Sequence, residues 1–252
     1  MIHLRSESDI AQLARAGRIV ALVLERMGEM IRPGISTLEL DQEAERLIRQ
    51  AGARPAFLGY GNPPFPASIC ASPEEVVVHG IPSRQVILQE GEIISIDVGA
   101  ELDGWYGDAA RTFAVGEISA EKQRLIRITR EAFYAGMDKA RPGNRLGDVS
   151  AAIQAVADRN GLGVVRDLTG HFIGREMHEE PSIPNFGRAG RGPRLAAGMI
   201  LAIEPMFALG GWQVTLDPVD EWTIRTRDKS PAAHYENTIA ITEEGPLILS
   251  RL

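Results

Sequence analysis

The sequence predicts an α+β fold in which one domain of 252 residues consists of two related halves, about 1–116 and 117–252. Two observations support this prediction. A pair of helical segments occurs twice with the same spacing, and each half contains an apolar strand that is interrupted by one acidic residue. Hydrophobic residues make up 44% of the chain, which is sufficient for a sizeable core. The halves are therefore expected to pack around a pseudo-twofold axis at which their acidic residues meet.

The predicted helices form the first repeat. Residues 9–31 carry apolar side chains near helical spacing and end at an Arg-Pro-Gly sequence, and a capping box at residues 36–39 begins a second helix that ends at Gly52. In the other half, Ser119 can cap a third helix, a second Arg-Pro-Gly sequence ends it, and a fourth helix ends at Gly161. In both pairs, 18 residues separate the glycine of Arg-Pro-Gly from the closing glycine. A coincidence of spacing is the alternative to a duplication.

The middle of the first half changes from loop to strand. Residues 53–68 predict a loop because their second part is rich in proline, and residues 76–79 predict a short strand. Residues 93–98 are mostly β-branched and apolar, and residues 111–115 provide a return strand. Asp103-Gly104 between them favours a two-residue turn, so the segment is predicted to be a β-hairpin.

This hairpin places two aspartates on one face. A two-residue turn pairs residue 97 with residue 110, whereas a register shifted by two pairs Asp97 with Asp108. Side chains alternate with period two, so in either register both carboxylates share a face, at most about 7–8 Å apart at Cβ. Two carboxylates in an apolar sheet repel each other, and a divalent cation between them removes that repulsion. A turn aspartate and an unrelated surface aspartate are the alternative.

The second half supplies matching acids and a histidine. Glu204 ends an apolar run that resembles the one ending at Asp97, and Glu236 precedes a strand-like segment, as Asp108 does. Between the halves, His171 lies in an apolar segment flanked by glycines, and His178 follows within eight residues. A lone histidine in such a segment is more often a core residue than a ligand, but two of the chain's five histidines fall here, which favours a site.

Four carboxylates and one imidazole thus form a candidate metal-ligand set: Asp97, Asp108, Glu204, Glu236 and His171. Oxygen-rich ligation suits Co, Mn, Fe or Zn, and four negative charges match two divalent cations. Two such ions about 3.5–4 Å apart can share a water and lower its pKa. The single cysteine, Cys70, excludes an internal disulfide and a cysteine-based zinc site.

Composition excludes several other classes of protein. No run of about 18 apolar residues is present to span a membrane, and residues 1–7 lack a signal or transit pattern. The net charge of −7 gives no general attraction to nucleic acid or acidic membranes. Residues 187–194 mix Gly and Arg, which indicates a flexible loop more than RNA contact. These features predict a cytoplasmic protein without nucleic-acid or membrane partners.

At the level of motifs, the chain resembles the type I methionine aminopeptidases of the pita-bread metallopeptidase fold over nearly its whole length. The resemblance rests on five groups of residues: Val78–Pro82; Ile96–Gly99 with Gly107–Thr112; Gly170-His171 with His178–Pro181; Ile203–Pro205; and Tyr235–Thr238. It implies a central antiparallel sheet with helices on its outer face. It also implies an enzyme that removes the initiator methionine from new chains with a small second residue.

The resemblance also implies a role for individual residues. Two metal ions would be bound by the five ligands named above, with Asp108 and Glu236 bridging them. Glu204 would act as general base, and His79 and His178 would contact the substrate and stabilise the transition state. The wall of the methionine pocket would comprise Phe65, Cys70, Met177, Trp222 and Tyr60. The chain departs from the family pattern at Phe172, at Met177 and in a longer loop at residues 61–66.

The expected partners are the N-termini of nascent polypeptides, the resemblance leaves a transient contact with the ribosome open, and a monomer is expected. The sequence leaves two alternatives open. One is another pita-bread aminopeptidase with a different first-residue preference, and the other is a non-catalytic binding protein on the same scaffold. His3 and His234 are expected to be surface residues.

Overall fold

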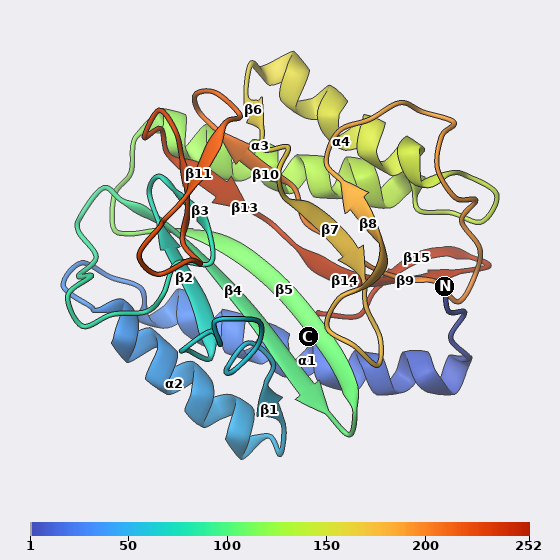
Figure 1. Cartoon of the computed structure of the whole chain (residues 1–252), viewed down its shortest axis with the longest axis horizontal. Coiled ribbons are helices and arrows are strands. Elements are labelled where there is room, and N and C mark those ends of the chain that lie inside the picture. Colours follow the sequence, from blue (N-terminus) through green and yellow to red (C-terminus); the bar gives the residue numbers. More distant parts are fainter. Residues whose placement is uncertain (1) are drawn as a thin grey trace.

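The strands of the protein lie between two pairs of helices (Figure 1). A computed structural model describes residues 2–252, and Met1 lies outside them. Helices α1 (Glu7–Met30) and α2 (Thr37–Gln50), in blue, lie on one side of the view, and α3 (Ala120–Lys139) and α4 (Leu146–Asn160), in green and yellow, lie on the other. Within residues 2–252, no helix combines the length and the apolar character that a membrane crossing requires.

The helices begin and end where the sequence predicts. Ser6 and Ser36 each form a capping box with the acidic residue three positions later, which begins α1 and α2. The side chain of Ser119 accepts a hydrogen bond from the backbone of the first turn of α3. Helix α4 ends at Gly161, whose φ of +64° lies in the left-handed region that favours glycine. The four predicted helices are therefore confirmed, because local capping chemistry fixes their ends.

The strands pair exclusively in the antiparallel sense within the described residues. In chain order they are β1 (Arg54–Pro55), β2 (Ile69–Pro73), β3 (Val76–Val78), β4 (Ile93–Leu102), β5 (Trp105–Ala114), β6 (Gly163–Val164), β7 (Thr169–Phe172), β8 (Glu179–Pro184), β9 (Ile200–Ile203), β10 (Met206–Ala208), β11 (Val214–Leu216), β12 (Ile224–Thr226), β13 (Ala232–His234), β14 (Asn237–Thr242) and β15 (Gly245–Ile248). The α+β prediction is confirmed, although the sequence analysis did not predict β2, the β7–β8 pair or the β11–β12 hairpin.

These strands form four sheets. In the first, β1, β2 and β5 all pair with β4, and the second has the order β15-β14-β9-β7-β8. Two three-stranded sheets, β13-β10-β6 and β11-β12-β3, extend beside them. The first two sheets meet where β5 approaches β14, since the backbone N–H of Glu236 donates to the carbonyl of Ala110 at 2.9 Å.

The β4–β5 hairpin adopts one of the two predicted registers. Asp97 pairs with Ala110, and Asp108 lies opposite Gly99, two positions further along the ladder. The turn residues Asp103 and Gly104 have φ values of +53° and +78°, as a two-residue turn of this type requires. Asp97 and Asp108 consequently lie on the same face of the hairpin, as the sequence predicts.

The remaining two acids lie where strands pass from one sheet to the next. Glu204 and Pro205 separate β9 from β10, and Tyr235 and Glu236 separate β13 from β14. The two breaks lie side by side, because the N–H of Tyr235 donates to the carbonyl of Pro205 at 3.2 Å. Glu204 and Glu236 therefore lie next to each other, each in a break between two strands.

The helices cover the face of the sheets opposite these acids. Ile94 and Ile96 of β4 pack into a core with Val20 and Leu24 of α1, so the alternation of the strand turns Asp97 to the other face. A second core joins α3 and α4 to β9 and β14. The departure at Phe172 lies in this second core, where the ring is fully buried. The functional side chains are thus presented on the face that the helices leave free.

Candidate active site

A single cavity collects most of the residues that the sequence analysis selected. It encloses about 310 Å³. Its lining side chains are Phe57, Tyr60, Phe65, Cys70, Val78, His79, Asp97, Asp108, Asp167, Leu168, Thr169, His171, His178, Glu204, Met206, Trp222, His234 and Glu236. We refer to Asp97, Asp108, His171, Glu204 and Glu236 as the ligand cluster, and to Tyr60, Phe65, Cys70 and Trp222 as the cavity wall.

The imidazole of His171 faces the carboxylates of the ligand cluster. Its Nδ1 lies 2.9 Å from the carbonyl oxygen of Phe172, an acceptor, so Nδ1 carries the proton. Its Nε2, which then has a free lone pair, lies 3.6 Å from Asp108 Oδ2 and 3.7 Å from Glu204 Oε1. This orientation by a backbone carbonyl is the one that metal-binding histidines usually show.

Several carboxylate oxygens of the cluster are buried without a hydrogen-bond partner. These are Asp97 Oδ1, Asp108 Oδ1 and Glu236 Oε1. Burial raises the pKa of all three carboxyl groups and of Glu204, and the neighbouring carboxylate of Asp108 raises the pKa of Asp97 further. An unpaired buried acceptor costs about 1–3 kcal/mol, and more when it is charged. The donor set of oxygens and imidazole nitrogens, left unpaired by the protein, therefore fits a divalent metal ion.

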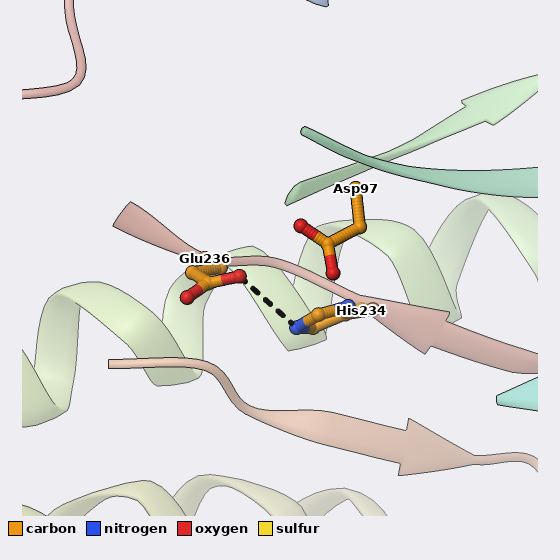
Figure 2. Close-up of side chains that lie close together, drawn as sticks. All are labelled: Asp97, His234 and Glu236. Carbon is orange, nitrogen blue, oxygen red and sulfur yellow. Dashed lines mark ion pairs between the residues drawn. The ribbon is translucent and has the colours of Figure 1, made fainter. Parts of the chain in front are cut away.

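Carboxylate oxygens and imidazole nitrogens at the cavity lie close enough for three side chains to bind one ion. Two groups of three side chains have ligand atoms within 4.8 Å of one another, and both include Glu236. One consists of Asp108, His171 and Glu236, and the other of Asp97, His234 and Glu236. The second group is drawn in Figure 2.

The placement of His234 corrects the sequence analysis. It was expected on the surface, but its side chain is 2% exposed and lines the cavity. The short strand β13 pairs with β10 so that His234 lies opposite Met206, which directs the ring toward the strand breaks at Glu204 and Glu236. The apolar residues just before it, and the predicted ligand two residues after it, were the available signals. His3, in contrast, is exposed as expected.

His79 is held at the cavity by a tight local structure. Its φ of +59° lies in the left-handed region, which a non-glycine residue rarely adopts. The next residue, Gly80, is bonded to β2 on both sides: its N–H donates to Ser72 Oγ at 3.1 Å, and its carbonyl accepts from the N–H of Ala71 at 2.8 Å. A Cβ on Gly80 would lie 2.2 Å from the Ala71 carbonyl oxygen, so only glycine fits.

His178 lies between the ligand cluster and the cavity wall. Its ring is 4.2 Å from that of His171, centroid to centroid, and its Nδ1 is 2.6 Å from the Tyr60 hydroxyl. Burial lowers the pKa of His79 to about 4 and that of His178 to about 3, so both imidazoles are neutral at pH 7. When the Tyr60 hydroxyl donates to Nδ1, His178 keeps its proton on Nε2 and can donate it to a substrate oxygen.

The cavity wall is mainly aromatic, and contacts between its side chains and a neighbouring loop hold it in place. Phe65 and Trp222 pack edge to face with centroids 5.3 Å apart, and Trp222 Nε1 donates to the carbonyl of Pro63 at 3.0 Å. Cys70 lines the same cavity. Met177, which was predicted to form part of the wall, is buried in the same apolar cluster as Phe65 but does not line the cavity.

Further lining residues were not selected from the sequence. They are Phe57, Val78, Asp167, Leu168, Thr169 and Met206. Most of them lie in segments without a periodic sequence pattern, and Val78 and Met206 have the apolar character of ordinary strand residues. They differ from other residues of this kind only in lying at the cavity, and the folded chain alone shows that.

Comparison with known proteins agrees with this geometry. Residues 11–243 match the model of metallopeptidase family M24. A methionine aminopeptidase of Clostridium acetobutylicum is 52% identical over 250 residues, which cover 99% of each chain. The crystal structure of methionine aminopeptidase from Rickettsia prowazekii matches with a TM-score of 0.97 and 41% identity, covering 99% of this chain and 100% of that one. An Xaa-Pro dipeptidase from Bacillus anthracis matches with a TM-score of 0.79 and 25% identity, and only 62% of that chain is covered. The chain belongs to metallopeptidase family M24.

Proposed function

We propose that the protein is a methionyl aminopeptidase that removes the initiator methionine from new polypeptides with a small second residue. The observation that carries this proposal is one cavity in which five predicted metal ligands lie beside an aromatic and sulfur-containing wall. Relatives that match the chain along its full length are methionine aminopeptidases, which supports the same activity.

The ligand cluster would hold two divalent ions of Co, Mn, Fe or Zn through its four carboxylates and the imidazole of His171. Two ions match the four carboxylates of the cluster in charge. When bound, they would lower the pKa of a water and polarise the scissile carbonyl. The cluster draws its carboxylates from both proposed halves of the chain, Asp97 and Asp108 from the first and Glu204 and Glu236 from the second, within one catalytic domain.

Glu204 is the proposed general base. Its carboxylate lies at a strand break and lines the cavity, with Oε1 3.7 Å from His171 Nε2. In the proposed reaction, Glu204 takes a proton from the attacking water and later delivers it to the amine that leaves. The water oxygen becomes part of the new carboxylate of methionine, and the peptide C–N bond breaks.

His79 and His178 are the proposed donors toward the substrate. Both imidazoles are neutral at pH 7, so each can donate one hydrogen bond without carrying a charge into the cavity. His178, oriented by Tyr60, would donate to the oxygen on which negative charge develops, where a fixed donor acts mainly in the transition state. His79 would contact the peptide on the other side of the scissile bond.

The cavity wall would select the first side chain. Phe65, Cys70 and Trp222 offer aromatic and sulfur surface to an unbranched thioether, which makes favourable sulfur–aromatic contacts. A methylene more or less changes such selection by only about 1–3 kcal/mol, so β-branched side chains must be rejected sterically. The second residue would pass close to His79, where a large side chain displaces the carbonyl; about 1 Å of displacement can cost roughly a hundredfold.

The proposed substrates also define the setting of the protein. They are N-termini of nascent chains, which places the activity in the cytoplasm and allows transient contact with a ribosome. A monomer is sufficient, because one chain supplies the entire cluster.

A different first-residue preference is the second candidate function, since an Xaa-Pro dipeptidase shares the fold. A binding protein without activity would need neither the unpaired carboxylates nor the oriented His178.

The test is release of free methionine from Met-Ala-Ser by protein that has been stripped of metal, with each divalent metal added back. Met-Ile-Ser, Leu-Ala-Ser and Pro-Ala-Ser serve as matched substrates. We expect Met-Ala-Ser to be cleaved fastest and only with metal. Faster cleavage of Pro-Ala-Ser than of Met-Ala-Ser would favour the dipeptidase-like preference. Equal cleavage of Met-Ile-Ser and Met-Ala-Ser would overturn the second-residue argument. No release of methionine with any metal would favour a binding protein without activity.

A further inference from the structure

We propose that His234 is a sixth metal ligand, which completes a second ion site together with Asp97 and Glu236 (Figure 2). This inference rests on the proposed function, because it assigns one more residue to the same metal centre. It gives each of the two groups of three side chains one imidazole: His171 in the group with Asp108, and His234 in the group with Asp97.

The main chain holds His234 in a fixed position. His234 is the last residue of β13, and both its N–H and its carbonyl lie 2.9 Å from Thr112 Oγ1 of β5. The Thr112 hydroxyl in turn lies 2.8 Å from Ser95 Oγ of β4, the strand that carries Asp97. His234 is therefore tied to the hairpin of the first half, although it belongs to the second.

The side chain of His234 points into the cluster without finding a partner there. Its Nε2 lies 3.6 Å from Glu204 Oε2 and 3.7 Å from Glu236 Oε2, which is too long for a hydrogen bond to either. Nε2 is buried and unpaired, and so are Asp97 Oδ1 and Glu236 Oε1 in the same group. Buried polar atoms are paired in the great majority of cases, so unpaired atoms on three side chains whose ligand atoms lie within 4.8 Å of one another point to a shared partner.

A metal ion satisfies these spacings better than a proton does. Ligand atoms that lie about 2.0–2.2 Å from one ion are separated from each other by about 3.0–3.5 Å in tetrahedral or octahedral geometry. The separation of Nε2 from Glu236 Oε2, 3.7 Å, is slightly above this range. In Figure 2, the carboxylates of Asp97 and Glu236 and the ring nitrogen of His234 all turn toward one common region.

The extra imidazole has a consequence for the choice of metal. Without His234, the ion beside Asp97 would have carboxylate oxygens and water as ligands, which suit Mn or Mg. An imidazole ligand shifts the preference of that position toward Zn, Co or Fe. The second ion should therefore be held more tightly in this chain than in a matched variant with an oxygen donor or an amide at residue 234.

The direct test is nuclear magnetic resonance of protein labelled with ¹⁵N in its histidine rings and loaded with two equivalents of ¹¹³Cd²⁺. A scalar coupling between ¹¹³Cd and ¹⁵N arises only across a coordination bond. The chain contains five histidines, so the ring signals can be assigned with single variants. We expect two coupled histidines, one signal being lost in His171→Gln and the other in His234→Gln. His3→Gln, the matched control at an exposed histidine, should retain both couplings.

Calorimetric titration of the metal-free protein with Zn²⁺ provides the second measurement. His234→Gln should weaken one of two binding steps by at least the roughly 10–100-fold that is typical when even an indirect metal contact is lost. His3→Gln should leave both steps unchanged. The number of coupled histidines is read in the unsubstituted protein, and the variants are needed only to assign each coupling to its residue.

Two results would overturn the inference, and they differ from each other. A protein that loads two ions and releases methionine but shows a single coupled histidine, lost in His171→Gln, would exclude His234 as a ligand and leave the proposed function intact. A protein that binds no metal and releases no methionine would overturn both.

Discussion

The ligand cluster and the cavity wall occupy one cavity but are built in different ways. The carboxylates of the cluster lie on paired strands or at breaks between them, so hydrogen-bonded registers fix which face each one occupies. The wall comes largely from the loop that contains Phe65 and from the segment that contains Trp222, and single contacts such as Trp222 Nε1 to the Pro63 carbonyl hold them. The chemistry of the site is thus fixed by the sheets, whereas its selectivity can be changed through loops.

The largest effect should come from breaking the ligand cluster. Asp108→Asn keeps the shape of the side chain but replaces a shared anion by an amide, so kcat/KM should fall by more than about 10³-fold, the upper end for one transition-state donor. The free energy of unfolding of the metal-free variant should stay the same or rise, because one buried carboxyl is removed. The measurements are methionine release and thermal unfolding.

A matched control for this change is Asp103→Asn. Asp103 belongs to the same hairpin, lies exposed in its turn and has a φ that asparagine tolerates. Its activity should remain at the level of the unsubstituted protein. If Asp108→Asn turned over as fast as this control, Asp108 would not be a ligand.

The next effect tests the boundary between the two regions. His178→Ala should lower kcat by about 10²–10³-fold, or roughly 2.7–4 kcal/mol, because a fixed donor to the developing charge is lost. KM should change much less, since the contact is made mainly in the transition state. Steady-state kinetics on Met-Ala-Ser separate the two constants. A variant in which only KM rises would make His178 a part of the binding wall.

The cluster should also leave a signature in the pH dependence of stability. Burial raises the pKa of its carboxyl groups, so the stability that protonation provides is lost as pH rises through those pKa values. Above about pH 8 the cavity histidines, whose pKa values folding lowers from 6.5, are neutral in both folded and unfolded chains and contribute little.

Metal-free protein should therefore lose stability from pH 8 to pH 9, by up to about 1.4 kcal/mol per pH unit for each carboxyl that folding keeps protonated. Chemical denaturation in the presence of a chelator measures this slope. Glu236→Gln should reduce the slope by one carboxyl, and saturating divalent metal should reduce it further. A slope that is the same in all three samples would show that the cluster does not titrate in this range.

The smallest effect concerns the contact between the cavity wall and His178. Tyr60→Phe removes the hydroxyl that lies against His178 Nδ1 and keeps the ring, so kcat should fall by about 2–12-fold, equivalent to about 0.5–1.5 kcal/mol for one hydrogen bond. Tyr134→Phe is the control, since its hydroxyl lies outside the cavity. Equal rates for the two variants would mean that Tyr60 does not orient His178.

Much of the fold was predictable because the relevant interactions are local. The capping box at Ser36 and the turn at Asp103-Gly104 depend on residues within four positions of each other, and both predictions are confirmed. Strand β2 was missed because its five residues, Ile69–Pro73, have no alternation: their partner β4 and the core bury them on both sides.

In the candidate site, too, some features follow from local sequence and others only from long-range packing. Period-two alternation was enough to place Asp97 and Asp108 on one face, but two registers satisfied it, and the pairing of Asp97 with Ala110 was decided by the ladder. The position of Met177 behind the wall could not be derived from its own neighbours, since the cavity is bounded by segments far apart in the chain.

The sequence by itself therefore determined the helices, the hairpin and the candidate ligands, because each is encoded in the type and spacing of nearby residues. Only the tertiary structure decided which side chains converge. Glu204, Glu236 and His234 meet because two strands break next to each other, and the apolar residues before His234 did not by themselves show that its ring would face these acids. Long-range packing brought His234 from an expected surface position to a buried one, where an unpaired nitrogen faces two carboxylates.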